Sequence, residues 1–218
     1  MLRHSLNRNL TLHTADQYAG MPVLTSPGPL IEQYLSRIQQ VTESALTQYP
    51  RTFAYRIDLR YPVDYLGTAM ESNQIIERFI ASLKAKLNHN RDKARQVNPH
   101  AHGNVLRYVW CREYGQNSGV PHYHLVLFLN NDAFCTLGKY QFGLDNLFNR
   151  LHEAWASALG MAVQDMSGLV ELPQDARWTL QSNNPSVMQE FFLRASYLAK
   201  AQTKYYHSGI HAFGSSRG

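Results

Sequence analysis

Two histidines, His122 and His124, stand two positions apart in a segment rich in Val, Leu and Phe. Successive side chains of a strand point to opposite faces, so both imidazoles project from the same face. A second segment of strand-forming residues, Val105 to Glu113, precedes them, and the residues between are typical of turns. If the two strands close as a symmetric antiparallel hairpin, Glu113 lies across from His122, and Cys111 across from His124.

Glu113, His122 and His124 then form a set of three metal ligands. Two neutral imidazoles and one carboxylate suit Mn²⁺, Mg²⁺ or Zn²⁺, and they leave coordination positions open for water or a phosphate oxygen. A histidine pair on a strand is also common as ordinary polar surface. The hairpin alone does not decide between these two interpretations.

A candidate nucleophile lies near the C-terminus, where a helix is predicted to begin at Asn184 and Pro185 and to run to about Tyr205. Tyr197 and Lys200 are neighbours on one face of this helix, and Lys204 continues their stripe. A phenol has a pKa of about 10, so its use as a nucleophile requires a nearby cation or metal. A tyrosine and a lysine on one helix are also commonplace without any function.

Composition limits the class of protein. The chain has 218 residues, a net charge of +5 and two cysteines. It is long enough to bury a core, has a mild bias toward polyanions and does not suggest a disulfide framework. No apolar run approaches the length of a membrane span, and the first residues lack the apolar centre of a secretory signal. We therefore expect a cytoplasmic protein with no membrane partner.

The elements expected to position these residues alternate between strand and helix. Residues 1–49 are predicted to be an N-terminal arm and a packing helix, and residues 50–218 a second domain. The strand Thr52 to Arg60 alternates strictly, and its charged face either lines a nucleic-acid groove or faces water. The other expected elements are a helix from Ser72 or Asn73, a helix from Leu144 that ends at Gly160, and short strands at Gly168 to Leu172 and Arg177 to Leu180.

This β-α-β-β-α-β order, followed by a helix with Tyr197 and Lys200, resembles the HUH endonuclease superfamily. Its signatures are a histidine pair around a bulky residue, here Tyr123, and a later Tyr-x-x-Lys. More narrowly, RxDLR, WxRE, HxH, YLAK and FGSSR resemble the replication-initiation proteins of filamentous phages and prophages over about residues 50 to 216. Two-tyrosine members have a second tyrosine where this chain has Ala201, so the resemblance points to the one-tyrosine type. Tyr205 and Tyr206 remain as spare tyrosines.

The resemblance implies an α+β fold, with an antiparallel β-sheet, flanking helices, a ferredoxin/RRM-like core and an added N-terminal helix. It also implies site-specific nicking and rejoining of single-stranded DNA that initiates rolling-circle replication. By this resemblance a divalent metal, Mn²⁺ or Mg²⁺, is held by Glu113, His122 and His124. Tyr197 is the nucleophile, and Lys200 offsets charge. The DNA contacts expected are Arg56, Asp58, Arg60 and Lys204.

The implied partners are single-stranded DNA or an origin hairpin, and a host helicase because no Walker A motif is present. An alternative is a non-catalytic DNA-binding or regulatory protein that keeps the fold. An RNA-end phosphoesterase would need two separated His-x-Thr or His-x-Ser pairs, and a structural zinc site would be expected to use cysteines. We further expect that alanine at Glu113, His122 or His124 abolishes cleavage and leaves the fold intact, on the premise that ligands on an open face are not core residues.

Overall fold

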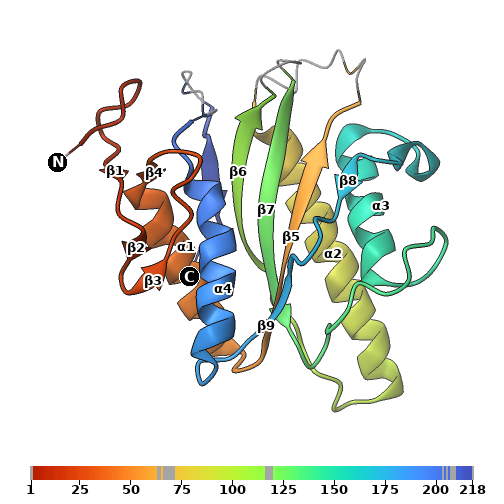
Figure 1. The fold of residues 1–218 in the computed structure, drawn as a ribbon. Coiled ribbons are helices and arrows are strands. Elements are labelled where there is room, and N and C mark those ends of the chain that lie inside the picture. The colour runs from red at the N-terminus through yellow and green to blue at the C-terminus, as the bar shows by residue number, and fades with distance from the viewer. Residues whose placement is uncertain are drawn as a thin grey trace.

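An antiparallel sheet forms the middle of the molecule (Figure 1). The computed structural model describes residues 2–62, 65, 72–115, 120–202, 204, 206 and 210–217. The strand order is β10-β6-β7-β5-β8, and β9 also pairs with β5. The strands are β5 (Thr52–Arg60), β6 (Arg107–Tyr114), β7 (Pro121–Asn130), β8 (Val170–Glu171), β9 (Arg177–Leu180) and β10 (Phe213–Ser215).

Helices cover both faces of this sheet (Figure 1). On one face, α2 (Gln74–Val97) and α3 (Leu147–Leu159) pack against the apolar side chains of β5 and β7. On the other face lie α1 (Glu32–Gln48) and α4 (Pro185–Ala195). The sequence specifies these helices because apolar residues recur at helical spacing, and because Gly160 ends α3 in the left-handed conformation with φ 71°. The predicted α+β class and the β-α-β-β-α-β order are confirmed.

The central hairpin has the predicted register. In the pairing of β6 with β7, Glu113 lies across from His122 and Cys111 across from His124. On its other side, β7 pairs with β5, so that Asp58 lies across from His124 and Arg60 across from His122. On the charged face of β5, Asp58 is buried, Arg56 is partly buried and Arg60 is exposed. The solvent-facing interpretation of this strand is therefore wrong for Asp58, which is buried.

The last helix is shorter than predicted. Helix α4 ends at Ala195, and a single 3-10 turn, η3 (Ser196–Ala199), follows it. Lys200 then adopts extended backbone angles and forms an isolated bridge with Leu30. The prediction of a helix to about Tyr205 is wrong because tertiary pairing with the N-terminal segment replaces the helical bonds. Tyr205 itself lies outside the described residues.

The N-terminal segment contains short antiparallel pairs: β1 (Leu12–His13) with β4 (Leu30–Ile31), and β2 (Gln17–Tyr18) with β3 (Met21–Pro22). The sequence predicted an arm here, and in the structure this segment packs against the end of α4. Ser196 Oγ accepts a hydrogen bond from Leu24 N at 2.9 Å, and Pro29 O accepts one from Ala201 N at 3.0 Å. The division at residues 49 and 50 stays a prediction. Among the described residues, no helix has both the length and the apolar character of a membrane span.

Candidate functional site

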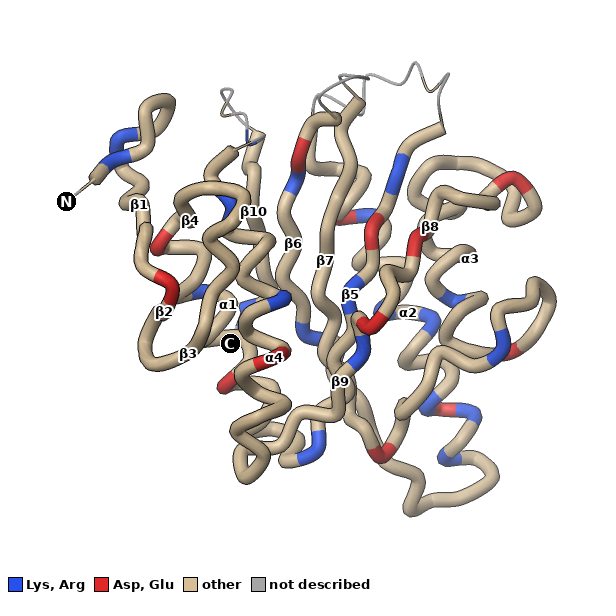
Figure 2. The backbone as a smooth tube through the Cα atoms, viewed as in Figure 1, with Lys and Arg blue, Asp and Glu red and all other residues tan. Residues whose placement is uncertain are grey.

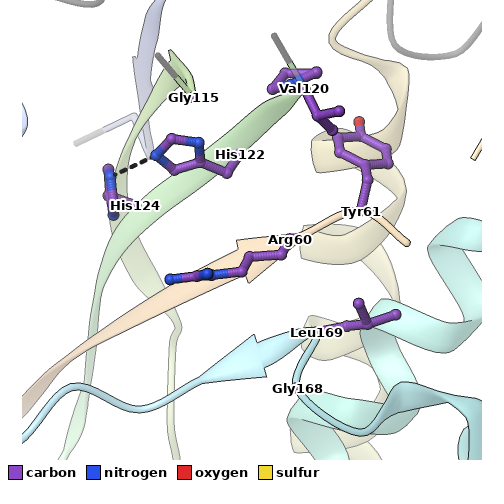
Figure 3. A pocket seen from close by; sticks show the side chains of 9 residues that line it. Arg60, Tyr61, Gly115, Val120, His122, His124, Gly168 and Leu169 are labelled. Atoms are coloured by element: carbon purple, nitrogen blue, oxygen red, sulfur yellow. Dashed lines mark hydrogen bonds between the residues drawn. The ribbon is translucent and has the colours of Figure 1, made fainter. Parts of the chain in front are cut away.

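The three predicted metal ligands meet at one end of the sheet, on the face that α1 and α4 cover. The candidate ligand atoms of Glu113, His122 and His124 all lie within 4.8 Å of one another. The two Nε2 atoms of the histidines are 3.1 Å apart (Figure 3), and His124 Nε2 is 3.6 Å from Glu113 Oε2. Cys111 is close but is not part of this donor set, because burial raises the pKa of its thiol to about 11.

Asp58 fixes the orientation of His124. Its Oδ1 lies 2.7 Å from His124 Nδ1, and Arg56 binds both oxygens of the same carboxylate at 3.2 Å. Burial raises the pKa of Asp58, but the hydrogen bond from His124 and the charge of Arg56 outweigh this effect, so the pKa is lowered. An ionised Asp58 accepts the proton on Nδ1, which leaves the lone pair of Nε2 directed at the cluster. Asp58 therefore orients a ligand rather than lying open to DNA.

His122 is also suited to ligate a metal. Burial, followed by the charge of His124, lowers the pKa of His122 to about 4. Its imidazole is therefore neutral near pH 7 and keeps a free lone pair, which a metal ligand requires. Together with the oriented His124 and the carboxylate of Glu113, this donor set fits the divalent metal that the resemblance implies.

Two lysines contact the same carboxylate. Lys204 Nζ is 2.8 Å from Glu113 Oε1, and Lys200 Nζ is 3.1 Å from Oε2. Burial raises the pKa of Glu113, but hydrogen bonds and charge from His124 and Lys204 outweigh burial, so the pKa lies well below its usual range. The side chain of Lys204 is fully buried. In this structure Lys204 is a partner of Glu113, and its position does not suit the predicted DNA contact.

Tyr197 reaches the cluster from η3. Its hydroxyl accepts a hydrogen bond from Lys200 Nζ at 3.0 Å, and its ring lies edge-on to His124 with centroids 5.6 Å apart. Arg56 lies over the same ring at 4.9 Å. Burial lowers the pKa of Lys200, but the hydrogen bond with Tyr197 and the charge of Glu113 outweigh burial and raise the pKa, so this ammonium stays charged beside the phenol.

The remaining predicted residues lie around this cluster. Acidic and basic residues lie near one another toward the ends of β5, β6 and β8 (Figure 2). Arg60 belongs to this group and pairs with Glu171 at 2.5 Å, with both side chains about half exposed. Tyr206 is engaged elsewhere, because its hydroxyl is 3.3 Å from the hydroxyl of Tyr34 and its ring packs edge-on against His4.

Two features of the site are not predicted by the sequence. One is the role of Asp58, which depends on the register of β5 against β7. The other is the contact of the N-terminal segment with Ser196 and the residues after it. The first had a signal in the sequence, since Asp58 lies on the polar face of a strictly alternating strand. The second had none, because its hydrogen bonds join residues more than 170 positions apart.

The fold and the site define an α+β protein with a candidate metal cluster beside a tyrosine and two lysines. The chain matches the YagK/YfjJ C-terminal domain family over residues 13–216 and belongs to this family. It is 32% identical over 203 residues to the uncharacterized protein YfjJ of Escherichia coli (strain K12), covering 88% of this chain and 97% of YfjJ. It is 33% identical over 200 residues to the uncharacterized protein YagK of the same strain, covering 87% of this chain and 95% of YagK. No solved structure matches the chain significantly.

Proposed function

We propose that this protein is a metal-dependent endonuclease of the HUH type, which nicks and rejoins single-stranded DNA through Tyr197. The observation that supports this most strongly is the convergence of two groups far apart in the sequence. The cluster of Glu113, His122 and His124 comes from the central hairpin, and Tyr197 comes from η3, yet the Tyr197 and His124 rings are in contact. Neither the histidine hairpin nor the Tyr-x-x-Lys motif by itself requires that the other lie near it in the fold.

Glu113, His122 and His124 would hold the divalent cation, Mn²⁺ or Mg²⁺. When bound there, this cation would supply Lewis-acid stabilisation of the charge that develops on the phosphate. The protein itself holds the donor atoms in the orientation that the cation requires. Asp58 holds the imidazole of His124 in one tautomer, and Lys204 holds Oε1 of Glu113.

Tyr197 would perform a transesterification. The bond from Tyr197 Oη to phosphorus forms, and the bond from phosphorus to the 3′ oxygen breaks. The phenolic proton leaves to solvent, and the departing 3′ oxygen gains a proton. The products are a 5′-phosphotyrosine and a free 3′-hydroxyl, so the reverse reaction can rejoin the strand. Lys200 donates a hydrogen bond to Oη, and its positive charge favours the phenolate.

The resemblance to the replication-initiation proteins of filamentous phages and prophages supports a role in starting rolling-circle replication. In that role, an origin in single-stranded or hairpin form is the substrate, and a host helicase unwinds the duplex. The contact of Arg56 with the Tyr197 ring is consistent with this use, since a guanidinium there lies next to the expected position of the phosphate.

The test is to incubate the purified protein with Mn²⁺ and single-stranded fragments of the DNA that flanks its gene, and to resolve the products on a denaturing gel. We expect a shortened strand and a covalent protein–DNA adduct that appear together. Tyr197→Phe removes one oxygen and should abolish both, whereas the matched variant Tyr206→Phe should retain both. Binding without an adduct would favour a regulatory DNA-binding protein. Cleavage by Tyr197→Phe would refute the assignment of the nucleophile.

A further inference from the structure

A cavity of about 450 Å³ adjoins the candidate site. Figure 3 shows it between the end of β5, the start of β7 and the segment that leads into β8. His122 and His124 line one side, so the cavity continues directly from the metal cluster. A molecule in this cavity would touch the same imidazoles that face a bound phosphate.

The inner wall of the cavity is apolar. It is lined by Tyr61, Val120, Pro121 and Leu169. The ring of Tyr61 is held in place by the rings of Tyr65 and Trp155, with centroid distances of 5.1 Å and 5.6 Å. Tyr61 is itself only 5% exposed, so the accessible part of this wall comes mainly from Val120 and Leu169. An apolar surface of this kind suits the flat face of a base.

One of the residues that line the cavity is a glycine, Gly168. Gly168 has φ +73°, a conformation that favours glycine, and a Cβ placed there would meet nothing within 4 Å. Gly168 and the next residue, Leu169, both line the cavity.

Arg60 supplies a cation at the mouth of the cavity, and Glu171, which does not line the cavity, pairs with it. Arg60 lies there with a half-exposed guanidinium, and Figure 3 shows it extending toward His124. None of the described residues that line the cavity is acidic. An apolar slot with a cation and two imidazoles at its mouth fits a flat ring that bears a phosphate.

We propose that this cavity binds the base of the nucleotide next to the phosphate that is cleaved, and so gives the protein a sequence preference at one position. The inference rests on the proposed function for the identity of the substrate. The base lies against Val120 and Leu169, and Arg60 contacts the adjoining phosphate.

Affinity for two probes of equal charge tests the base pocket without requiring cleavage. One probe is a short single-stranded oligonucleotide of mixed sequence, and the other is the same length with abasic sites throughout. Burial of one base against this apolar wall is expected to favour the first probe by roughly tenfold. Leu169→Trp, which fills the cavity, should remove most of this preference and leave binding of the abasic probe unchanged. Val120→Phe narrows the cavity from the wall formed at the start of β7 and should act in the same direction.

Leu144→Trp is the matched control, because Leu144 is exposed and does not line the cavity. It should leave both affinities unchanged. Arg60→Gln should weaken both probes equally, because it removes a phosphate contact. Thermal unfolding and Mn²⁺ binding of each variant verify that the fold and the cluster are retained.

The inference is overturned if folded Leu169→Trp and Val120→Phe keep the full preference for bases, or if they weaken both probes equally. Failure of the proposed function has a different result. Base-dependent binding that is lost in Leu169→Trp, with no covalent adduct on any DNA, would support the pocket and refute the nicking.

Discussion

Glu113 is predicted to stabilise the fold as well as to bind the metal. Its side chain is buried, with the residue 2% exposed, and it pairs with the ammonium groups of Lys200 and Lys204. The premise that ligands on an open face are not core residues is therefore wrong for Glu113. Glu113→Gln keeps the size of the side chain and removes its charge. Lys204, with a fully buried side chain, would then lose its counter-charge.

The size of the effect follows from this burial. Removing one partner of a buried ion pair costs roughly 3–5 kcal/mol, because the other charge remains buried and unpaired. For a chain of this length, each kcal/mol lowers the melting temperature by roughly 2–4 °C, so Glu113→Gln should melt roughly 6–20 °C lower. Lys204→Met should cost less, since Glu113 retains Lys200 and His124. The double variant should recover part of the loss, with a coupling of roughly 1–3 kcal/mol.

Urea unfolding followed by circular dichroism, in the presence of a chelator, measures the free energy of unfolding of the wild type, the two single variants and the double variant. These four proteins form a double-mutant cycle. Glu171→Gln is the matched control, because Glu171 is 48% exposed in its pair with Arg60. It should change the free energy of unfolding by no more than about 1 kcal/mol. A Glu113→Gln variant as stable as the control, or strictly additive effects in the cycle, would refute the buried pair.

Three other predictions concern the residues around the cluster. Asp58→Asn should weaken Mn²⁺ binding by roughly 10- to 100-fold, because His124 loses the carboxylate that orients it. Calorimetry that gives the wild-type affinity would contradict this role. Ser196→Ala removes the acceptor for Leu24 N, so adduct formation should slow with Mn²⁺ affinity unchanged, and a parallel loss of both would indicate a general structural role. The pKa of His122 is lowered to about 4 from its ordinary 6.5. As the pH falls, the unfolded chain therefore binds a proton at this histidine at a higher pH than the folded chain does. Stability should therefore be complete above about pH 6.5 and fall as the pH drops toward 4. The loss should be smaller in His122→Gln, and an equal loss would rule out His122 as its source.

The sequence predicted the parts of the site that depend on local order. Alternation along a strand places His122 and His124 on one face, and the turn residues before them define a hairpin with Glu113 opposite. Both results depend on neighbours in the chain and on the two-residue period of a strand. The same is true of Gly160, whose left-handed conformation ends α3 as predicted.

The features of the site that the sequence did not predict depend on contacts between distant segments. Lys204 is buried inside the site because the chain takes an extended path after η3. The helical spacing of Tyr197, Lys200 and Lys204 did not predict this path. That path exists because the backbone at Ala201 bonds to Pro29 rather than to the preceding turn. Helical spacing in the sequence indicates propensity, and here tertiary pairing prevails over it.

The position of Tyr197 therefore depends on both ends of the chain. A single 3-10 turn has poor hydrogen-bond geometry and little stability of its own. Here η3 is held by Leu24 at Ser196 and is followed at once by the bridge of Leu30 with Lys200. The match to the family begins at residue 13 and so includes these N-terminal contacts. The sheet positions the candidate metal ligands, and the N-terminal segment positions the tyrosine against them, so the candidate site requires both.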